Sequence, residues 1–114
     1  MLLSLLKSKI HNATVTGVRV DYVGSITIDK TLIGAAGLRV WEKVLVANIT
    51  NGERFETYVI EGNTGVVEVN GAAAKLAAIG DKVIVMAFGL FDEKEGKEHK
   101  PNILVVDDKN RITS

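Results

Sequence analysis

The chain has 114 residues, the size of a single domain, and it contains no cysteine. Disulfides, thiolate metal sites and thiol nucleophiles are therefore excluded. Basic and acidic residues balance at 14 each, and no basic run gives the chain the charge pattern of a nucleic-acid-binding protein. No stretch approaches the roughly 20 apolar residues that cross a bilayer. We expect one cytoplasmic domain over residues 1–114, with neither a membrane nor a nucleic acid as partner.

Short runs rich in β-branched residues follow one another and predict strands. Residues 1–7 are apolar but too short for a signal peptide, so we expect an edge or barrel strand there. Asn51-Gly52 is a strong hairpin signal. The further expected strands cover residues 14–21, 25–28, 44–49, 54–60, 66–69, 82–91 and 103–106.

Two short helical segments are expected between these strands. Asp29 can cap a helix over residues 30–36, and Asn70 precedes an alanine-rich helical stretch over 71–78. The charged segment 92–100 indicates a solvated loop or one helical turn. Many short strands with brief helices predict a mainly β fold, and closing the sheet into a small barrel would remove its exposed edges.

The pair Gly24-Ser25 is the most informative feature for chemistry. Glycine adopts backbone conformations closed to other residues, and the serine hydroxyl follows directly on the carbonyl of the preceding peptide bond. If the fold strains that bond, the hydroxyl can attack the carbonyl. Elimination across Ser25 would then break the chain and leave a new carbonyl group on the second piece. The same pair is common in ordinary turns, so only the surrounding residues can distinguish a self-cleavage site from a turn.

The strand predicted over residues 54–60 carries several candidate side chains. Arg54, Glu56 and Tyr58 fall at every second position and face one way, whereas Thr57 faces the other. Arginine suits a carboxylate ligand, and a phenol can donate a proton. An ordinary exposed strand face with an Arg-Glu pair would produce the same pattern.

Other polar residues are equally open to two interpretations. Lys9 and His11 share one strand face, where a solvated lysine and a surface histidine are ordinary, and the distant His99 gives no metal-ligand spacing. Asn70 with residues 71–74 indicates helix capping. Alternatively, it forms a strand-to-helix junction whose free N–H groups meet an anion.

A series of short motifs, in this order, resembles the family of pyruvoyl-dependent aspartate 1-decarboxylases. The motifs are Lys9-x-His11, Tyr22-x-Gly24-Ser25-x-x-Ile28-Asp29, Ala35-Ala36-Gly37, Asn48-x-Thr50-Asn51-Gly52-x-Arg54-Phe55-x-Thr57-Tyr58 and Val69-Asn70-Gly71-Ala72-Ala73-Ala74. The resemblance implies a mainly β fold, a small six-stranded double-psi β-barrel with short helices. It also implies a homotetramer, and a carbon–carbon lyase that converts L-aspartate to β-alanine and CO2 for pantothenate and coenzyme A synthesis.

The resemblance further implies self-cleavage between Gly24 and Ser25 into a 24-residue β chain and a 90-residue α chain. Ser25 would become a covalent pyruvoyl group that forms a Schiff base with aspartate and accepts the electron pair released with CO2. Tyr58 would donate the proton, and Thr57 would polarise the Gly24 carbonyl during processing, in which Tyr22 also takes part. Some relatives need an accessory maturation protein, so the resemblance allows such a factor as a partner of this chain.

The implied substrate-binding residues are Lys9, Arg54, Thr57, Asn70, Gly71, Ala72 and Ala73. Because strand alternation sends Thr57 away from Arg54 and Tyr58, we expect active sites shared between subunits. Ile26 replaces a cysteine that many relatives carry, and Ala47 stands where some carry an aromatic residue. These changes affect the pocket shape and the processing rate rather than the reaction.

Two other functions stay open from the residues alone. A non-catalytic β-barrel could bind a small acidic ligand through Arg54 and never be cleaved. A hydrolase could use Ser25 as its nucleophile, although neither histidine has a recognisable triad partner.

Overall fold

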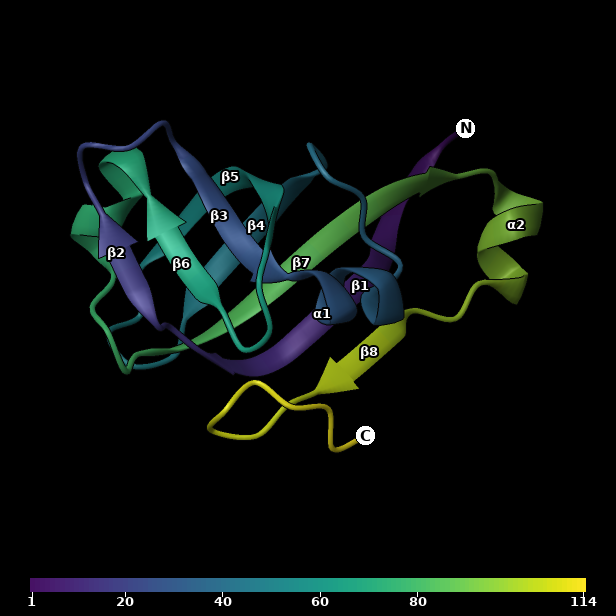
Figure 1. The fold of residues 1–114 in the computed structure, drawn as a ribbon. Helices are drawn as coiled ribbons and strands as arrows, with labels where there is room; N and C mark the ends of the chain where they lie inside the picture. The colour runs from purple at the N-terminus through teal and green to yellow at the C-terminus, as the bar shows by residue number, and fades with distance from the viewer.

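The computed structural model describes all 114 residues (Figure 1). The strands are β1 (Leu3–Thr14), β2 (Gly17–Arg19), β3 (Ser25–Asp29), β4 (Lys43–Asn48), β5 (Arg54–Gly62), β6 (Val67–Asn70), β7 (Lys82–Phe91) and β8 (Asn102–Val105). The helices are α1 (Lys30–Ala36), the 3-10 helix η1 (Gly71–Leu76) and α2 (Glu93–Glu98). None of these helices has the length and apolar character that crossing a membrane requires.

The strands form one eight-stranded sheet in the order β2-β6-β3-β5-β4-β7-β1-β8. Strand β2 lies at one end of this order, and β1 lies next to the other end. Only Val15 and Thr16 separate β1 from β2 along the chain, so the sheet must curve back on itself (Figure 1). The predicted mainly β class is confirmed. The curvature, with six strands between the short β2 and β8, is consistent with a barrel.

Side chains on the concave side of the curved sheet form the hydrophobic core. Strands β4, β5 and β7 bury alternate residues, as the period of a strand requires. Residues between the buried positions point away from the core, and we call the surface that they form on β3, β5, β4, β7 and β1 the outer face. The fully buried large side chains are Ile10, Val15, Ile26, Ile28, Leu32, Val44, Val46, Val59, Val67, Val69, Val83 and Val85.

The strand expected over residues 14–21 exists, but its expected bounds are wrong. Strand β1 already runs from Leu3 to Thr14, and the chain then turns a corner, so that β2 covers only Gly17–Arg19. At the corner, the Thr16 amide and hydroxyl both donate to the Val67 carbonyl. The β-branched pattern continues through this corner, which is why the sequence did not reveal it.

The local signals for helices and turns are largely confirmed. The Asp29 side chain accepts a hydrogen bond of 2.7 Å from the Thr31 amide and caps α1. The charged segment after β7 forms α2, which begins with a capping box between Asp92 and Glu95. The hairpin at Asn51-Gly52 joins β4 to β5.

Candidate active site

Ser25 is the first residue of β3 and is 1% exposed. Its neighbour Ile26 points into the core, and strand alternation therefore directs Ser25 and Thr27 to the outer face. The serine hydroxyl donates a hydrogen bond of 3.1 Å to the Val23 carbonyl, two residues back in the chain. The hydroxyl thus points towards the loop that precedes the expected cleavage point at Gly24.

Asn70 lies directly opposite Ser25 in the antiparallel pair of β3 and β6. Its buried Nδ2 donates to the Ser25 hydroxyl over 3.0 Å and to the Thr27 hydroxyl over 2.9 Å. The buried Oδ1 of Asn70 has no hydrogen-bond partner. The expectation that Asn70 caps the following helix is wrong, because its side chain makes no capping bond to η1 and turns to the two hydroxyls instead.

Gly71 packs against the backbone of Gly24. Its φ is +76°, in the left-handed region that disfavours side chains. A Cβ atom here would lie 2.5 Å from the Gly24 Cα and 2.9 Å from the Gly24 nitrogen. Only glycine therefore allows this approach. The next two residues of η1 are more open, with Ala72 exposed and Ala73 half-buried.

The loop before Gly24 is held by Tyr22. The guanidinium carbon of Arg19 lies 4.6 Å from the centre of the Tyr22 ring, a cation–π contact. The Tyr22 amide also donates to the Arg19 carbonyl over 3.2 Å, and the Arg19 guanidinium lies 4.0 Å from the Glu68 carboxylate. Arg19 was not among the predicted residues, although its position three residues before Tyr22 is a turn spacing.

Strand β5 places Tyr58 beside Ser25. The parallel pairing of β3 and β5 begins at Ile26 and Val59, so the preceding residues, Ser25 and Tyr58, lie next to each other on the outer face. Thr57 points inward, as the alternation predicted, and is half-buried. Thr57 and Tyr58 both line a shallow depression of about 300 Å³.

Arg54 and Lys9 lie on the outer face but away from Ser25. Arg54 is four residues before Tyr58, which separates their Cα atoms by roughly 13 Å along the strand. A row of paired residues, Lys9, Met86, Leu45 and Glu56, runs across four strands. Three strand spacings place Lys9 about 14 Å from β5 along this row.

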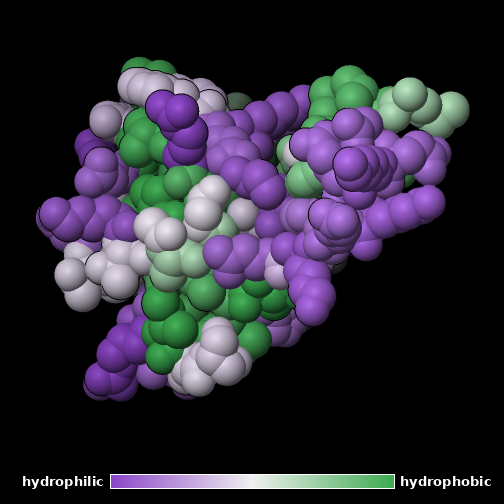
Figure 2. Space-filling view, turned by 90° about the vertical axis from the view of Figure 1, so that its right-hand side faces the viewer, coloured by the Kyte–Doolittle hydropathy of each residue, from purple (hydrophilic) through white to green (hydrophobic).

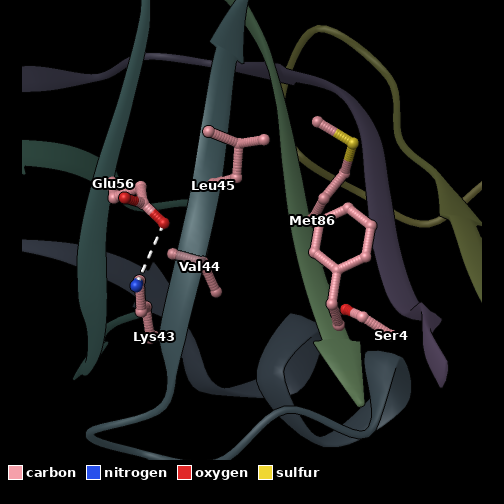
Figure 3. A pocket seen from close by; sticks show the side chains of 7 residues that line it. Ser4, Lys43, Val44, Leu45, Glu56 and Met86 are labelled. Carbon is pink, nitrogen blue, oxygen red and sulfur yellow. Dashed lines mark ion pairs between the residues drawn. The ribbon is translucent and has the colours of Figure 1, made fainter. Parts of the chain in front are cut away.

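A hollow of about 290 Å³ lies on the outer face over β5, β4, β7 and β1 (Figure 3). None of the residues predicted for the site lines it; its walls are Ser4, Lys43, Val44, Leu45, Glu56, Met86 and Phe88. At its rim Lys43 forms an ion pair of 3.1 Å with Glu56. The alternative of an ordinary Arg54–Glu56 pair is therefore wrong, which leaves the Arg54 guanidinium available for a ligand.

Two residues near Ser25 were not among the predicted ones. Thr27 shares the Asn70 amide with Ser25, and its position two residues along the same strand could have revealed it. Trp41 lies against Tyr58, with 5.7 Å between the ring centres. Its distance from Tyr58 in the sequence gave no signal.

Comparisons with known proteins show the family of this chain. A family model described as aspartate decarboxylase matches residues 1–113. Aspartate 1-decarboxylase from Caldicellulosiruptor saccharolyticus is 58% identical, with 98% of this chain and 89% of the relative covered. The enzymes of that name from Lactiplantibacillus plantarum and Campylobacter jejuni are 53% and 54% identical, with 99% of this chain covered in both cases and 88% and 90% of the relatives. The chain therefore belongs to the aspartate decarboxylase family.

Proposed function

We propose that this chain decarboxylates L-aspartate to β-alanine and CO2, with a pyruvoyl group made from its own Ser25. The observation that carries the proposal is the buried Ser25 hydroxyl, hydrogen-bonded to Asn70 directly after Gly24, in a chain whose relatives are aspartate 1-decarboxylases. The product would supply pantothenate and coenzyme A synthesis in the cytoplasm.

The surroundings of Ser25 fit such a group. When formed, a pyruvoyl group supplies a carbonyl that condenses with the substrate amine and withdraws the electron pair released with CO2. The Asn70 Nδ2 already donates to the oxygen on the Ser25 side chain, and its unpartnered Oδ1 is a buried acceptor that a bound donor could satisfy. Burial keeps bulk water from the residue.

Processing begins at the same hydroxyl. The Ser25 Oγ forms a bond to the Gly24 carbonyl carbon while the Gly24–Ser25 C–N bond breaks, and the proton passes from oxygen to nitrogen. Loss of the Ser25 Cα proton and breakage of its Cβ–Oγ bond then release Gly24 as a carboxylate and leave a C=C double bond at residue 25. The resulting enamine becomes an imine, and one water hydrolyses this imine to the ketone and ammonia. The Oγ must first turn from the Val23 carbonyl, its partner at 3.1 Å, towards Gly24. Thr57 would polarise the Gly24 carbonyl in this step.

Other residues of the chain take the remaining roles. Tyr58 lies beside Ser25 on the outer face and would donate the proton that replaces the lost carboxylate. A phenol hydroxyl can donate its proton. Arg54 and Lys9 would bind the substrate carboxylates as cations, while Gly71, Ala72 and Ala73 enclose the substrate.

The distances favour sites shared between copies of the chain. In one copy the Arg54 Cα lies roughly 13 Å from the Tyr58 Cα and Lys9 lies about 14 Å from β5, and curvature spreads outer side chains further apart. Large apolar side chains are also exposed, including Trp41, Phe88 and Leu90. Apolar residues reach the surface beside a larger hydrophilic area in Figure 2. We infer a homotetramer in which Arg54 and Lys9 of one copy complete the site at Ser25 of another.

Intact-mass measurement and product analysis test the proposal. The purified chain should separate into pieces of 24 and 90 residues, the larger with a modified first residue, and should release β-alanine from aspartate. Borohydride should trap aspartate on the larger piece. The Ser25→Ala variant should stay in one piece and release no β-alanine. An unbroken wild-type chain that only binds aspartate would instead support the non-catalytic acidic-ligand protein.

Mixed assemblies test the sharing of sites. Ser25→Ala copies exchanged with Arg54→Ala copies should recover activity, because an intact Ser25 then meets an intact Arg54 from its neighbour. Ser25→Ala mixed with Tyr58→Phe is the matched control and should recover none, since Ser25 and Tyr58 are adjacent in one copy. Equal recovery in both mixtures, or in neither after verified exchange, would refute this arrangement.

A further inference from the structure

Trp41 has an unusual backbone conformation for a bulky residue. It is the chain's one tryptophan, it lies between α1 and β4, and its φ is +78°. Left-handed backbone is rare for residues with large side chains and is an outlier that calls for an explanation. The indole does not belong to the hydrophobic core and is 72% exposed. Burial of the indole within one copy of the chain therefore does not explain the strained conformation.

Backbone hydrogen bonds fix this segment to β5. The Trp41 amide donates to the Val59 carbonyl over 2.7 Å, and the Val59 amide donates to the Glu42 carbonyl over 3.0 Å. The left-handed turn is thus anchored one residue from Tyr58. The centres of the indole and phenol rings are 5.7 Å apart and their planes are tilted by 32°, within the range in which aromatic pairs attract.

We propose that Trp41 is a positioning residue that fixes the orientation of the Tyr58 phenol. Tyr58 is half-buried on the outer face, and an unsupported side chain at such a place changes rotamer within nanoseconds. The indole removes that freedom on one side of the ring. The inference rests on the proposed role of Tyr58 as proton donor, because a proton is delivered efficiently only from a fixed direction.

A merely structural role of Trp41 predicts that its replacement lowers activity only as far as it lowers stability, whereas positioning of Tyr58 predicts a loss of activity without a loss of stability. Asparagine tolerates left-handed backbone better than tryptophan, so Trp41→Asn relieves the strain and should leave the thermal unfolding midpoint unchanged or raise it. If Trp41 positions Tyr58, the same variant should lower kcat roughly tenfold with little change in KM. Trp41→Phe keeps an aromatic ring and should restore most of the lost kcat. Wild-type kcat in Trp41→Asn, or a loss that follows reduced stability, would overturn the proposal.

Two readouts do not depend on activity and use the uncleaved Ser25→Ala protein. Ionised tyrosine quenches nearby tryptophan emission, so Trp41 fluorescence should fall in an alkaline titration. Tyr58→Phe should abolish this fall, and Tyr22→Phe should retain it. The NMR order parameter of the Tyr58 ring should decrease in Trp41→Asn and recover in Trp41→Phe. An unchanged titration in Tyr58→Phe, or an unchanged order parameter in Trp41→Asn, would refute the positioning role. If the wild-type protein produces no β-alanine while both readouts behave as expected, the proposed function fails and the positioning of Tyr58 stands.

Discussion

Replacing Gly71 by alanine perturbs two things at one position. The first is the backbone: φ is +76°, and an alanine in left-handed conformation costs about 1–2 kcal/mol. The second is space, because the new Cβ would lie 2.5 Å from the Gly24 Cα and 2.9 Å from its nitrogen. Both contacts are with backbone, so the loop must move, and such overpacking costs about 1–3 kcal/mol. The expected loss in unfolding free energy is therefore about 2–5 kcal/mol.

Gly80→Ala is the matched control. Gly80 has a φ of +94°, but a Cβ there meets no atom within 4 Å. This variant should lose only the conformational part, about 1–2 kcal/mol. The difference between the two variants measures the contact between Gly71 and Gly24. Urea unfolding in the Ser25→Ala background gives both values without interference from cleavage.

The same pair of variants tests processing when Ser25 is present. A displaced Gly24 no longer presents its carbonyl to the hydroxyl, so Gly71→Ala should be cleaved at least roughly tenfold more slowly than the parent. Gly80→Ala should be cleaved at the parental rate, as intact-mass measurements over time would show. If the two variants lose equal stability and are cleaved equally fast, the contact with Gly24 has no such role.

Two predictions concern the C-terminal turn. Buried Asn110 bonds the Thr14 amide over 2.7 Å, the Thr14 carbonyl over 2.9 Å and the Gly65 carbonyl over 3.0 Å. Asn110→Ala should therefore lower the urea-unfolding free energy by about 3 kcal/mol. Asn110→Gly should lose less unfolding free energy than Asn110→Ala, because φ is +59° and glycine adopts this left-handed conformation without strain. Equal losses in the two variants would contradict this reasoning. A hydrogen bond from the Arg111 backbone amide is the main cause that lowers the pKa of Asp107. This carboxylate stabilises the fold above its ordinary pKa, and the contribution is lost as the pH falls through the lowered value. Asp107→Asn should therefore lose less of its thermal stability on acidification than the wild type, and identical acid profiles would contradict this.

Local chemistry made part of the structure predictable. The alternation of β5 correctly placed Arg54 and Tyr58 on one face and Thr57 on the other, because burial follows the two-residue period of a strand. The helix cap at Asp29 was equally visible, since its carboxylate bonds an amide two residues away. Both features depend on neighbours within a few positions of the sequence.

The contacts made by the Ser25 side chain depend on pairing over long distances. Asn70 is opposite Ser25 only because β3 and β6 pair in one particular register. A residue before an alanine-rich helix has the composition of a cap, and that local interpretation was wrong because tertiary hydrogen bonds to Ser25 and Thr27 replaced the capping bond. Trp41 reaches Tyr58 through a left-handed turn that no sequence pattern for a bulky residue indicates.

Asn70 and Gly71 on one side of β3, and Tyr58 on the other side, have different roles around Ser25. On the β6 side, Asn70 and Gly71 contact Ser25 and Gly24, the residues that flank the bond to be cleaved. On the β5 side, the outward Tyr58 contacts an aromatic neighbour rather than that bond. Gly71→Ala should therefore slow cleavage, whereas Tyr58→Phe should be cleaved like the parent and then release β-alanine slowly. Mass spectrometry and product analysis on the same samples separate these steps. If Tyr58→Phe stayed uncleaved, the phenol would act before the reaction with aspartate, and this division would be wrong.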